Sequence, residues 1–374
     1  MQNQKSIDYR FKLLYTFGII MVVCGHTPGG GIVLLSDWFP YGGLHLALFA
    51  FCSGYFYKSS AEDSVLKYFL KKMRTLIIPL YIYTLVYGLI VQVARRAGFA
   101  MGGDFNFSNL VIAPITSGHQ FIYNMGGWFV VPLFMVEMLN VLIRKILKLI
   151  HKNIPEWIFF IIGVALGITG NQLACMGYLQ NWWLVLVRML YFMPFYSLGI
   201  LYKNKLEQFD RKLPSFWYFT VIFALKLALA YHYGKMPAYT PSWCHDFTEG
   251  PLIPIIVGYL GIALWMRIAG ILEPAIGRSK WVNLIADNTY SIMMNQFLGF
   301  MIIKTIYAWI SKYYAGFSDF NLTSYQTDIF WYYIPKGLSY TVLIYVAAGI
   351  AFPILVQKGI DITKYFILRK IKKQ

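Results

Sequence analysis

The sequence predicts an all-α protein, a bundle of about ten transmembrane helices with both termini in the cytoplasm. Of its 374 residues, 58% are hydrophobic and only 13% are charged, whereas about a quarter of the residues of a soluble domain are charged. Ten apolar stretches are long enough to cross a bilayer core of roughly 30 Å, which takes about 20 helical residues. Backbone polar groups in lipid must pair within their segment, and these runs lack the alternation of barrel strands, so we expect helices.

The ten stretches follow one another without an internal repeat, a low-complexity tract or a soluble domain. We therefore expect a single transmembrane domain over residues 1–374. The first stretch is interpreted as a retained helix, because no small-residue cleavage site follows it. The approximate ranges are 12–32, 42–58, 75–94, 127–146, 157–175, 182–202, 215–232, 251–271, 284–310 and 337–357.

The distribution of positive charge predicts the orientation. The net charge is +17, but the basic residues form short clusters between apolar stretches, which argues against a nucleic-acid partner. With the N-terminus inside, 25 of the 33 Lys and Arg residues fall in cytoplasmic segments, five in outer segments and three within spans. This bias follows the positive-inside rule and supports an even number of helices in the cell (cytoplasmic or inner) membrane.

The four cysteines lack the paired spacing of metal ligands, so no metal is expected. Cys175 and Cys244 both fall in predicted outer loops, where they could form a disulfide or remain as unlinked thiols. The outer segments also contain aromatic residues, amides, carboxylates and the histidines His119 and His245. Such loops could line a glycan-binding cleft, although ordinary solvated loops have the same composition.

The first stretch ends with a histidine. His26 lies 16 residues after Arg10, a rise of about 24 Å, so we place it in the outer half of the bilayer. Thr27, Pro28 and three glycines follow, and they would end or break the helix there. A neutral imidazole at such a break can accept a proton from a hydroxyl. An interfacial histidine bonded to a carbonyl would have the same surroundings.

The second stretch has polar residues at two depths. His45 lies near its outer start, where a depth similar to that of His26 would allow a paired site. Ser53, Gly54 and Tyr55 lie about two turns deeper. Gly54 permits close approach of a neighbouring backbone, with hydroxyls on either side of it. Ser53 could also be a nucleophile, but no adjacent base is evident.

A basic run precedes the third stretch. Lys71, Lys72 and Arg74 satisfy the positive-inside rule without any further function, and they would also suit the phosphates of a nucleotide-type cofactor. Neither a phosphate-binding glycine loop nor a nucleophile-elbow or zinc-protease motif occurs in the chain. ATP-driven transport and serine-hydrolase chemistry are therefore not favoured.

The fourth stretch contains a carboxylate at its middle. An isolated Glu137 there would either protonate or find a cation, and Arg188 and Lys226 are candidate partners. A structural ion pair is one interpretation, and an electrostatic role near a bound cofactor is the other.

Taken together, these segments resemble the acyltransferase 3 family of integral-membrane O-acyltransferases, especially a branch similar to fucose 4-O-acetylases. The resemblance spans most of the chain, and its specificity comes from the order and spacing of the motifs. The matching segments are VVCGH ending at His26, LHLALFAFCSGYFYK, the basic run before LIIPLYIY, Gly127-Trp128-Phe129, FYSLGILYKNK and ADNTYSIMMNQF.

The resemblance implies an acyl-CoA-dependent O-acyltransferase that moves an acyl group, expected to be acetyl, from cytoplasmic acetyl-CoA to a hydroxyl of an extracytoplasmic or lipid-linked glycan. A helix-one histidine would be central to transfer, as base or as acyl relay. The partners would be the bilayer and the glycan acceptor, and homo-oligomerisation is left open. On this hypothesis the catalytic residues are His26, His45 and Glu137, the donor-binding residues are Lys12, Lys71, Lys72, Arg74 and Arg188, and the acceptor-binding residues are Ser53, Tyr55, Trp128 and Asn295.

Two positions depart from the family pattern. Relatives usually carry Arg or Lys eleven residues before the helix-one histidine, where this chain has Tyr15, with Lys12 nearly one turn earlier. Many relatives have a histidine near Asn295 or Gln296, and this chain has none there. The alternatives are a glycan or small-amphiphile transporter that uses the buried polar residues as a proton pathway, and a non-catalytic membrane subunit.

Overall fold

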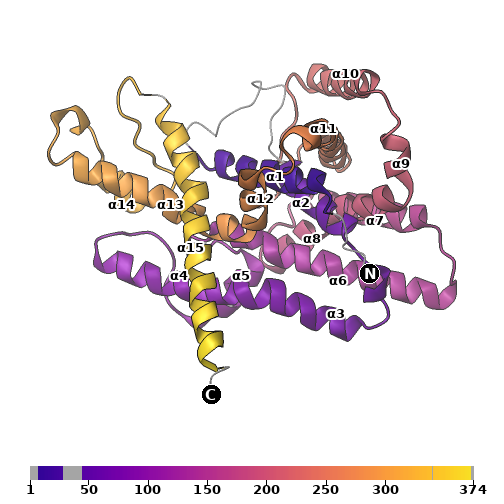
Figure 1. Ribbon diagram of the computed structural model, residues 1–374, viewed down its shortest axis with the longest axis horizontal. Coiled ribbons are helices and arrows are strands. Elements are labelled where there is room, and N and C mark those ends of the chain that lie inside the picture. Colours follow the sequence, from indigo (N-terminus) through magenta and orange to yellow (C-terminus); the bar gives the residue numbers. More distant parts are fainter. Residues whose placement is uncertain (1–6, 28–43, 339, 372–374) are drawn as a thin grey trace.

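A computed structural model describes residues 7–27, 44–338 and 340–371, and within these ranges it contains helices and no strands (Figure 1). The predicted all-α class is therefore confirmed. The longer helices are α1 (Tyr9–Gly25), α2 (Leu44–Tyr55), α3 (Val65–Lys72), α4 (Ile78–Arg96), α6 (Val130–Ile150), α7 (Glu156–Cys175), α8 (Trp182–Leu201), α10 (Ser215–Tyr233), α11 (Ile253–Ile276), α12 (Lys280–Asp287), α13 (Thr289–Ile310) and α15 (Thr341–Ile371). Short helices α5 (Ala113–Thr116), α9 (Glu207–Asp210) and α14 (Leu322–Thr327) lie between them.

Seven helical segments among the described residues are long and apolar enough to cross a membrane, which makes this a multi-pass membrane protein. They are Val65–Arg96, Met125–Ile150, Glu156–Cys175, Trp182–Asp210, Ser215–Tyr233, Ile253–Ile276 and Thr341–Phe366. The other three predicted stretches coincide with α1, α2 and α13. The first two continue into residues 28–43, outside the described part of the chain, and α13 contains polar residues. The ten-helix count and the cytoplasmic termini remain predictions.

The segment before the third predicted span is more helical than expected. Residues 59–74 were predicted as an extramembrane connection, but α3 begins at Val65, where the Ser64 hydroxyl caps the helix by accepting a hydrogen bond from the Lys67 amide. A π-helical turn, Met73–Ile77, joins α3 to α4. Pro79 follows this turn, and because proline has no N–H, the regular helical ladder could not continue unchanged. The basic residues of this segment are thus held on one continuous helix.

Close packing around α8 organises the core. A Cβ atom at Gly54 of α2 would lie 1.9 Å from the Tyr196 carbonyl oxygen, and one at Gly199 of α8 would lie 2.1 Å from the Phe51 carbonyl oxygen. The two backbones therefore touch at both glycines, as small residues allow between membrane helices. This confirms the close approach predicted at Gly54. On the other side of α8, α7 packs through its own glycines, including Gly163 against Ser197.

None of the four cysteines, all of which lie in the described part of the chain, forms a disulfide. The Cys175 thiol is exposed and donates to the Phe247 carbonyl at 3.0 Å, while the Cys244 thiol is buried and donates to the Pro241 carbonyl at 3.2 Å. The disulfide between these two residues is therefore absent, and the interpretation as unlinked thiols holds.

Candidate functional site

Two adjoining cavities lie beside α1 and α2. The first, here called the mouth cavity, has a volume of about 580 Å³ and opens on the predicted cytoplasmic side. Its cationic residues are Lys58, Lys67, Lys71 and Lys72, and its acidic residues are Asp63 and Glu137. The surplus of positive charge, on a surface that also presents serine hydroxyls, favours an anionic ligand.

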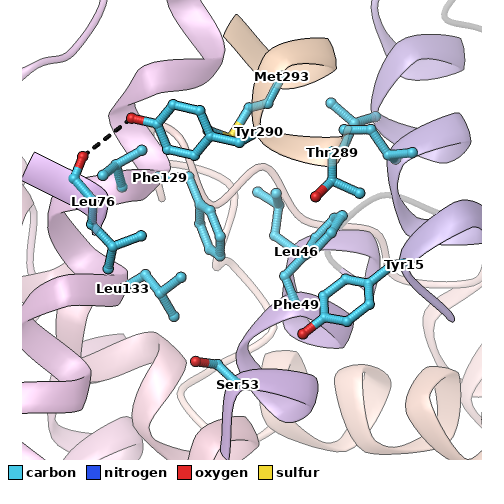
Figure 2. Close-up of a pocket in the computed structure, with 13 residues that line it drawn as sticks. Tyr15, Leu46, Phe49, Ser53, Leu76, Phe129, Leu133, Thr289, Tyr290 and Met293 are labelled. Atoms are coloured by element: carbon cyan, nitrogen blue, oxygen red, sulfur yellow. Dashed lines mark hydrogen bonds between the residues drawn. The ribbon is translucent and has the colours of Figure 1, made fainter. Parts of the chain in front are cut away.

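The second, here called the narrow cavity, has a volume of about 180 Å³ and is mostly apolar (Figure 2). It follows α1 from Tyr15 past Ile19 to Val22, a rise of about 10 Å. Residues from α2, α6 and α13 form its other sides, with Phe49, Phe129 and Met293 among them. The Tyr290 hydroxyl donates to the Leu76 carbonyl at 3.2 Å and ties α13 to the π-helical turn (Figure 2).

Tyr15 and Ser53 line both cavities and mark the junction between them. Tyr15 is the position at which relatives usually carry a cation. Here an aromatic ring stands at the junction, with its centroid 5.9 Å from that of Phe49. The two cavities therefore form a path that is wide and cationic at one end and narrow and apolar at the other.

A buried carboxylate lies beside this junction. Glu137 Oε1 accepts from Ser53 Oγ at 2.6 Å and forms an ion pair with Lys72 Nζ at 2.6 Å. The expected partner was Arg188 or Lys226, and that expectation was wrong. Glu137 Oε2 is buried and has no hydrogen-bond partner among the described residues. Glu137 thus orders Ser53 and Lys72 and has one oxygen left for a ligand in the mouth cavity.

His26 lies one helical turn beyond the end of the narrow cavity. It caps the C-terminus of α1, and its Nδ1 is 2.8 Å from the carbonyl oxygen of Val22, a residue that lines the cavity. A carbonyl can only accept a hydrogen bond, so Nδ1 carries the proton and Nε2 carries the lone pair. This is the tautomer that a base or nucleophile requires.

The α13 helix faces the same imidazole. The Phe297 ring centroid lies 5.0 Å from that of His26, and the neighbouring Gln296 side chain is close enough to interact with it. Gln296 is fully buried, and its Oε1 has no hydrogen-bond partner within the described part of the chain. A protonated His26 would offer that oxygen a donor.

The structure does not place His45 at the depth of His26. The His45 carbonyl oxygen is 3.6 Å from the position of a Cβ atom on Gly18, which lies eight residues, or about 12 Å of rise, before His26. The expectation of two histidines at one depth is therefore not met, because the start of α2 lies beside the middle of α1 and not beside its C-terminal end. A role for His45 in catalysis remains a prediction.

The other predicted site residues divide into two groups. Lys71 and Lys72 line the mouth cavity, as expected of donor-binding residues. Four others line neither cavity. Lys12 pairs with Asp287, and Arg74 is exposed. The Tyr55 hydroxyl donates to Glu207 at 2.9 Å, while the Asn295 side chain forms hydrogen bonds with Tyr87 at 2.7 Å and Ser291 at 2.8 Å.

Arg188 and Trp128 belong to the outer side instead. Arg188 is almost fully buried and donates to the carbonyl oxygens of Ser117 and Ser242, each at 3.1 Å, while it stacks 4.7 Å over the Trp128 ring. It thereby ties two predicted outer loops together and does not join Lys71 and Lys72.

His119 is stacked on Trp243 within these outer loops, with ring centroids 4.5 Å apart. Burial, with Arg188 and His26 nearby, lowers the pKa of His119 to about 3, so its ring is neutral at physiological pH. Its Nδ1 is buried and has no partner among the described residues. Because His26 is near enough to affect the pKa of His119, these predicted outer loops reach the neighbourhood of His26.

These features define a class of protein: a multi-pass helical membrane protein with a histidine near both a path that is cationic at one end and a group of polar loops. The chain belongs to the acyltransferase 3 family, because the family profile described as an acyltransferase domain matches residues 8–357. It is accordingly a membrane acyltransferase, which confirms the predicted family, whereas the fucose 4-O-acetylase-like branch remains a prediction. Neither a curated protein nor a solved structure matches the chain.

Several residues around the path were not predicted as site residues. Tyr15 was noted only as a departure from the family pattern, and Thr289, Tyr290 and Met293 were not singled out. Tyr15 lies on α1 and the other three lie on α13, far away in the sequence. The segment ADNTYSIMMNQF contains Thr289, Tyr290 and Met293, but nothing in it marks these three as cavity-lining residues. Gln296 gave a signal, since the resemblance implies a histidine near Asn295 or Gln296 in many relatives, and the Gln296 side chain is close to His26.

Proposed function

We propose that this protein moves an acetyl group from cytoplasmic acetyl-CoA to a hydroxyl of an extracytoplasmic or lipid-linked glycan. One observation carries the proposal: a cationic mouth continues into a narrow apolar path that ends one helical turn from His26. The polarity of this path matches an acyl-CoA, in which anionic phosphates lead through a slender pantetheine arm to an uncharged thioester.

The residues of the path have distinct roles in this proposal. Lys71 and Lys72 attract the phosphates, and the free oxygen of Glu137 accepts a hydrogen bond from an amide N–H of the arm. Tyr15 and the apolar residues beyond it exclude water from the thioester, which limits hydrolysis. Only the acyl group has to move beyond His26 to the acceptor. The charged phosphates of the donor therefore do not enter the apolar core.

His26 acts as the base. Its Nε2 takes the proton of the acceptor hydroxyl while that oxygen attacks the thioester carbonyl carbon. The carbon–oxygen bond forms, the carbon–sulfur bond breaks, and the proton passes from the imidazolium to the departing thiolate. Between these two steps the Gln296 Oε1 accepts a hydrogen bond from the protonated Nε2, and so stabilises the imidazolium more than the resting ring. A relay through an acyl-imidazole uses the same Nε2 atom.

The acceptor approaches from the outer side, where His119, Trp243 and Arg188 gather. This proposal places the protein in the cell (cytoplasmic) membrane, between the acyl-CoA pool and a surface glycan. The transporter alternative rested on buried polar residues as a proton pathway. Membership of an acyltransferase family does not favour it.

The test is acetyl-CoA turnover by purified protein in nanodiscs, followed as release of the CoA thiol. We expect His26→Ala to lower the rate about 10²- to 10⁴-fold, as loss of a general base does. His151→Ala is the matched control, because His151 is an exposed residue at the end of α6, away from both cavities. Calorimetry should show acetyl-CoA binding retained in both variants. Wild-type protein that elutes as a single species but neither binds nor consumes acetyl-CoA would contradict the proposal.

A further inference from the structure

A third cavity adjoins the mouth cavity on the side away from the narrow one. This side cavity has a volume of about 370 Å³ and shares Tyr57, Lys58 and Ser60 with the mouth cavity. The three cavities therefore form one series, with the apolar cavity at one end and the side cavity at the other. The side cavity is also lined by Ser59, Arg144, Lys148, Glu156, Ile200, Lys203 and Asn204.

Positive charge dominates the side cavity. Its lining has four cationic residues, Lys58, Arg144, Lys148 and Lys203, and a single carboxylate, Glu156. The ammonium groups of Lys58 and Lys203 are close enough to repel each other. Like charges held together cost free energy, and an anion placed between them removes that cost.

Carboxylates hold two of these cations, Arg144 and Lys148, in place. Arg144 is buried and bonded to Glu156 and to Asn140, and it stacks 4.2 Å over the Phe159 ring. Lys148 forms an ion pair with Glu62 at 2.7 Å. They are fixed in position, whereas Lys203 is exposed, with its Nζ 3.4 Å from the Tyr57 carbonyl oxygen and 5.6 Å from the centroid of the Tyr55 ring. Lys203 can therefore turn to a ligand at little cost.

We infer that the side cavity binds the 3′-phosphate of the donor's nucleotide, with Lys58 and Lys203 as its cationic ligands and Ser59 and Ser60 as hydroxyl donors. The inference rests on the proposed function, because it takes acyl-CoA as the donor. A ligand whose thioester lies in the narrow cavity and whose pantetheine and diphosphate cross the mouth cavity brings its nucleotide end past Lys58. A phosphate monoester carries a charge of about −1.5 to −2, which suits a pair of repelling lysines.

A comparison within the same protein supports this choice of cavity. A cavity of about 250 Å³ near the start of α1 contains three arginines, Arg10, Arg211 and Arg267. Each is already paired with a carboxylate: Arg10 and Arg211 with Glu207, and Arg267 with Asp210. That cavity shares no lining residue with the mouth cavity. Arginine content alone therefore does not make an anion site here, whereas the side cavity joins the mouth cavity through three shared lining residues.

The experiment compares acetyl-CoA with 3′-dephospho-acetyl-CoA as donor for the wild-type protein in nanodiscs. We expect kcat/KM to favour acetyl-CoA about tenfold, the value of one charge-assisted contact. Lys203→Gln removes the charge and leaves a polar side chain one atom shorter, and it should raise KM for acetyl-CoA while leaving KM for the dephospho donor and kcat unchanged. Lys205→Gln is the matched control, since Lys205 is exposed on the same π-helical turn as Lys203, Tyr202–Leu206, and lines none of these cavities.

The outcomes separate this inference from the proposed function. Loss of donor preference in Lys203→Gln but not in Lys205→Gln supports a 3′-phosphate site. Equal use of both donors by the wild-type protein, or an equal rise of both KM values in Lys203→Gln, overturns the inference and leaves acyl-CoA as the donor. Binding of neither donor to well-folded wild-type protein overturns the proposed function and this inference with it.

Discussion

Among single residues, Glu137 is the one whose surroundings matter most for the integrity of the site. It is 1% exposed and pairs with Lys72, whose side chain is 22% exposed. Removing one partner of such a pair leaves an uncompensated charge in a poorly solvated place, at a cost of about 3–5 kcal/mol when both are fully buried. The partial exposure of Lys72 lowers that figure, because water screens the pair.

We expect Lys72→Met to destabilise the protein by about 2 kcal/mol, because Glu137 would remain buried without its ion-pair partner. The measurement is the midpoint of thermal unfolding in detergent. Lys72→Met combined with Glu137→Met should recover most of the loss, since no isolated charge remains. Lys71→Met is the control, because Lys71 is exposed on the same helix. A double variant as unstable as the single one would show that the pair itself contributes little.

The identity of that pair also shows what could be predicted at the residue scale. The need of Glu137 for a cation follows from its place in an apolar stretch. The choice of Lys72 does not follow, because Lys72 lies 65 residues away along the chain and was assigned to an extramembrane run. Its side chain reaches Glu137 only because α3 is helical and continuous with α4, which keeps this basic segment against α6.

At the scale of elements, the contact between α2 and α8 holds Ser53 at the junction of the two cavities. Ser53 is followed at once by Gly54, whose Cα faces the Tyr196 carbonyl. We expect Gly54→Ala to cost about 3 kcal/mol or more, since an added methyl group would push two backbones apart. Gly359→Ala on α15 is the control, because its Cβ would meet no atom within 4 Å. Thermal unfolding in detergent measures both, and a Gly54→Ala protein as stable as Gly359→Ala would disprove the backbone contact.

The elements themselves were predictable where apolar length decides them. The stretches at 157–175, 182–202 and 215–232 agree closely with α7, α8 and α10. The start of α3 and the length of α15 were not predicted, because hydropathy treats a basic amphipathic turn as a loop although its backbone remains helical. The order of the cavities could not be predicted either, since it depends on which helix faces which.

At the scale of the whole molecule, the proposed reaction needs the inner path and the outer loops on opposite sides of one bilayer. That requirement depends on how many helices cross, and α13 is the deciding element. It contains Asn295, Gln296 and Lys304, which lower its hydropathy, and it is not one of the seven segments that qualify by length and composition. Lys304 is fully buried, however, and donates to the Ile329 carbonyl at 2.6 Å, while Asn295 bonds Tyr87. Polar groups satisfied inside a bundle do not prevent a helix from crossing.

We therefore expect residues on either side of the segment from α7 to α13 to lie on opposite faces of the membrane. Five predicted crossings, at α7, α8, α10, α11 and α13, separate Lys152 from Ser318, and both residues are exposed. In a Cys175→Ser background, an impermeant maleimide should label Ser318→Cys in intact cells and Lys152→Cys only after permeabilisation. If α13 does not cross, four crossings remain and both positions share one side. Labelling of both cysteines under the same condition would therefore show that α13 does not cross the membrane. The inner path and the outer loops would then not lie on the opposite sides that the proposed transfer requires.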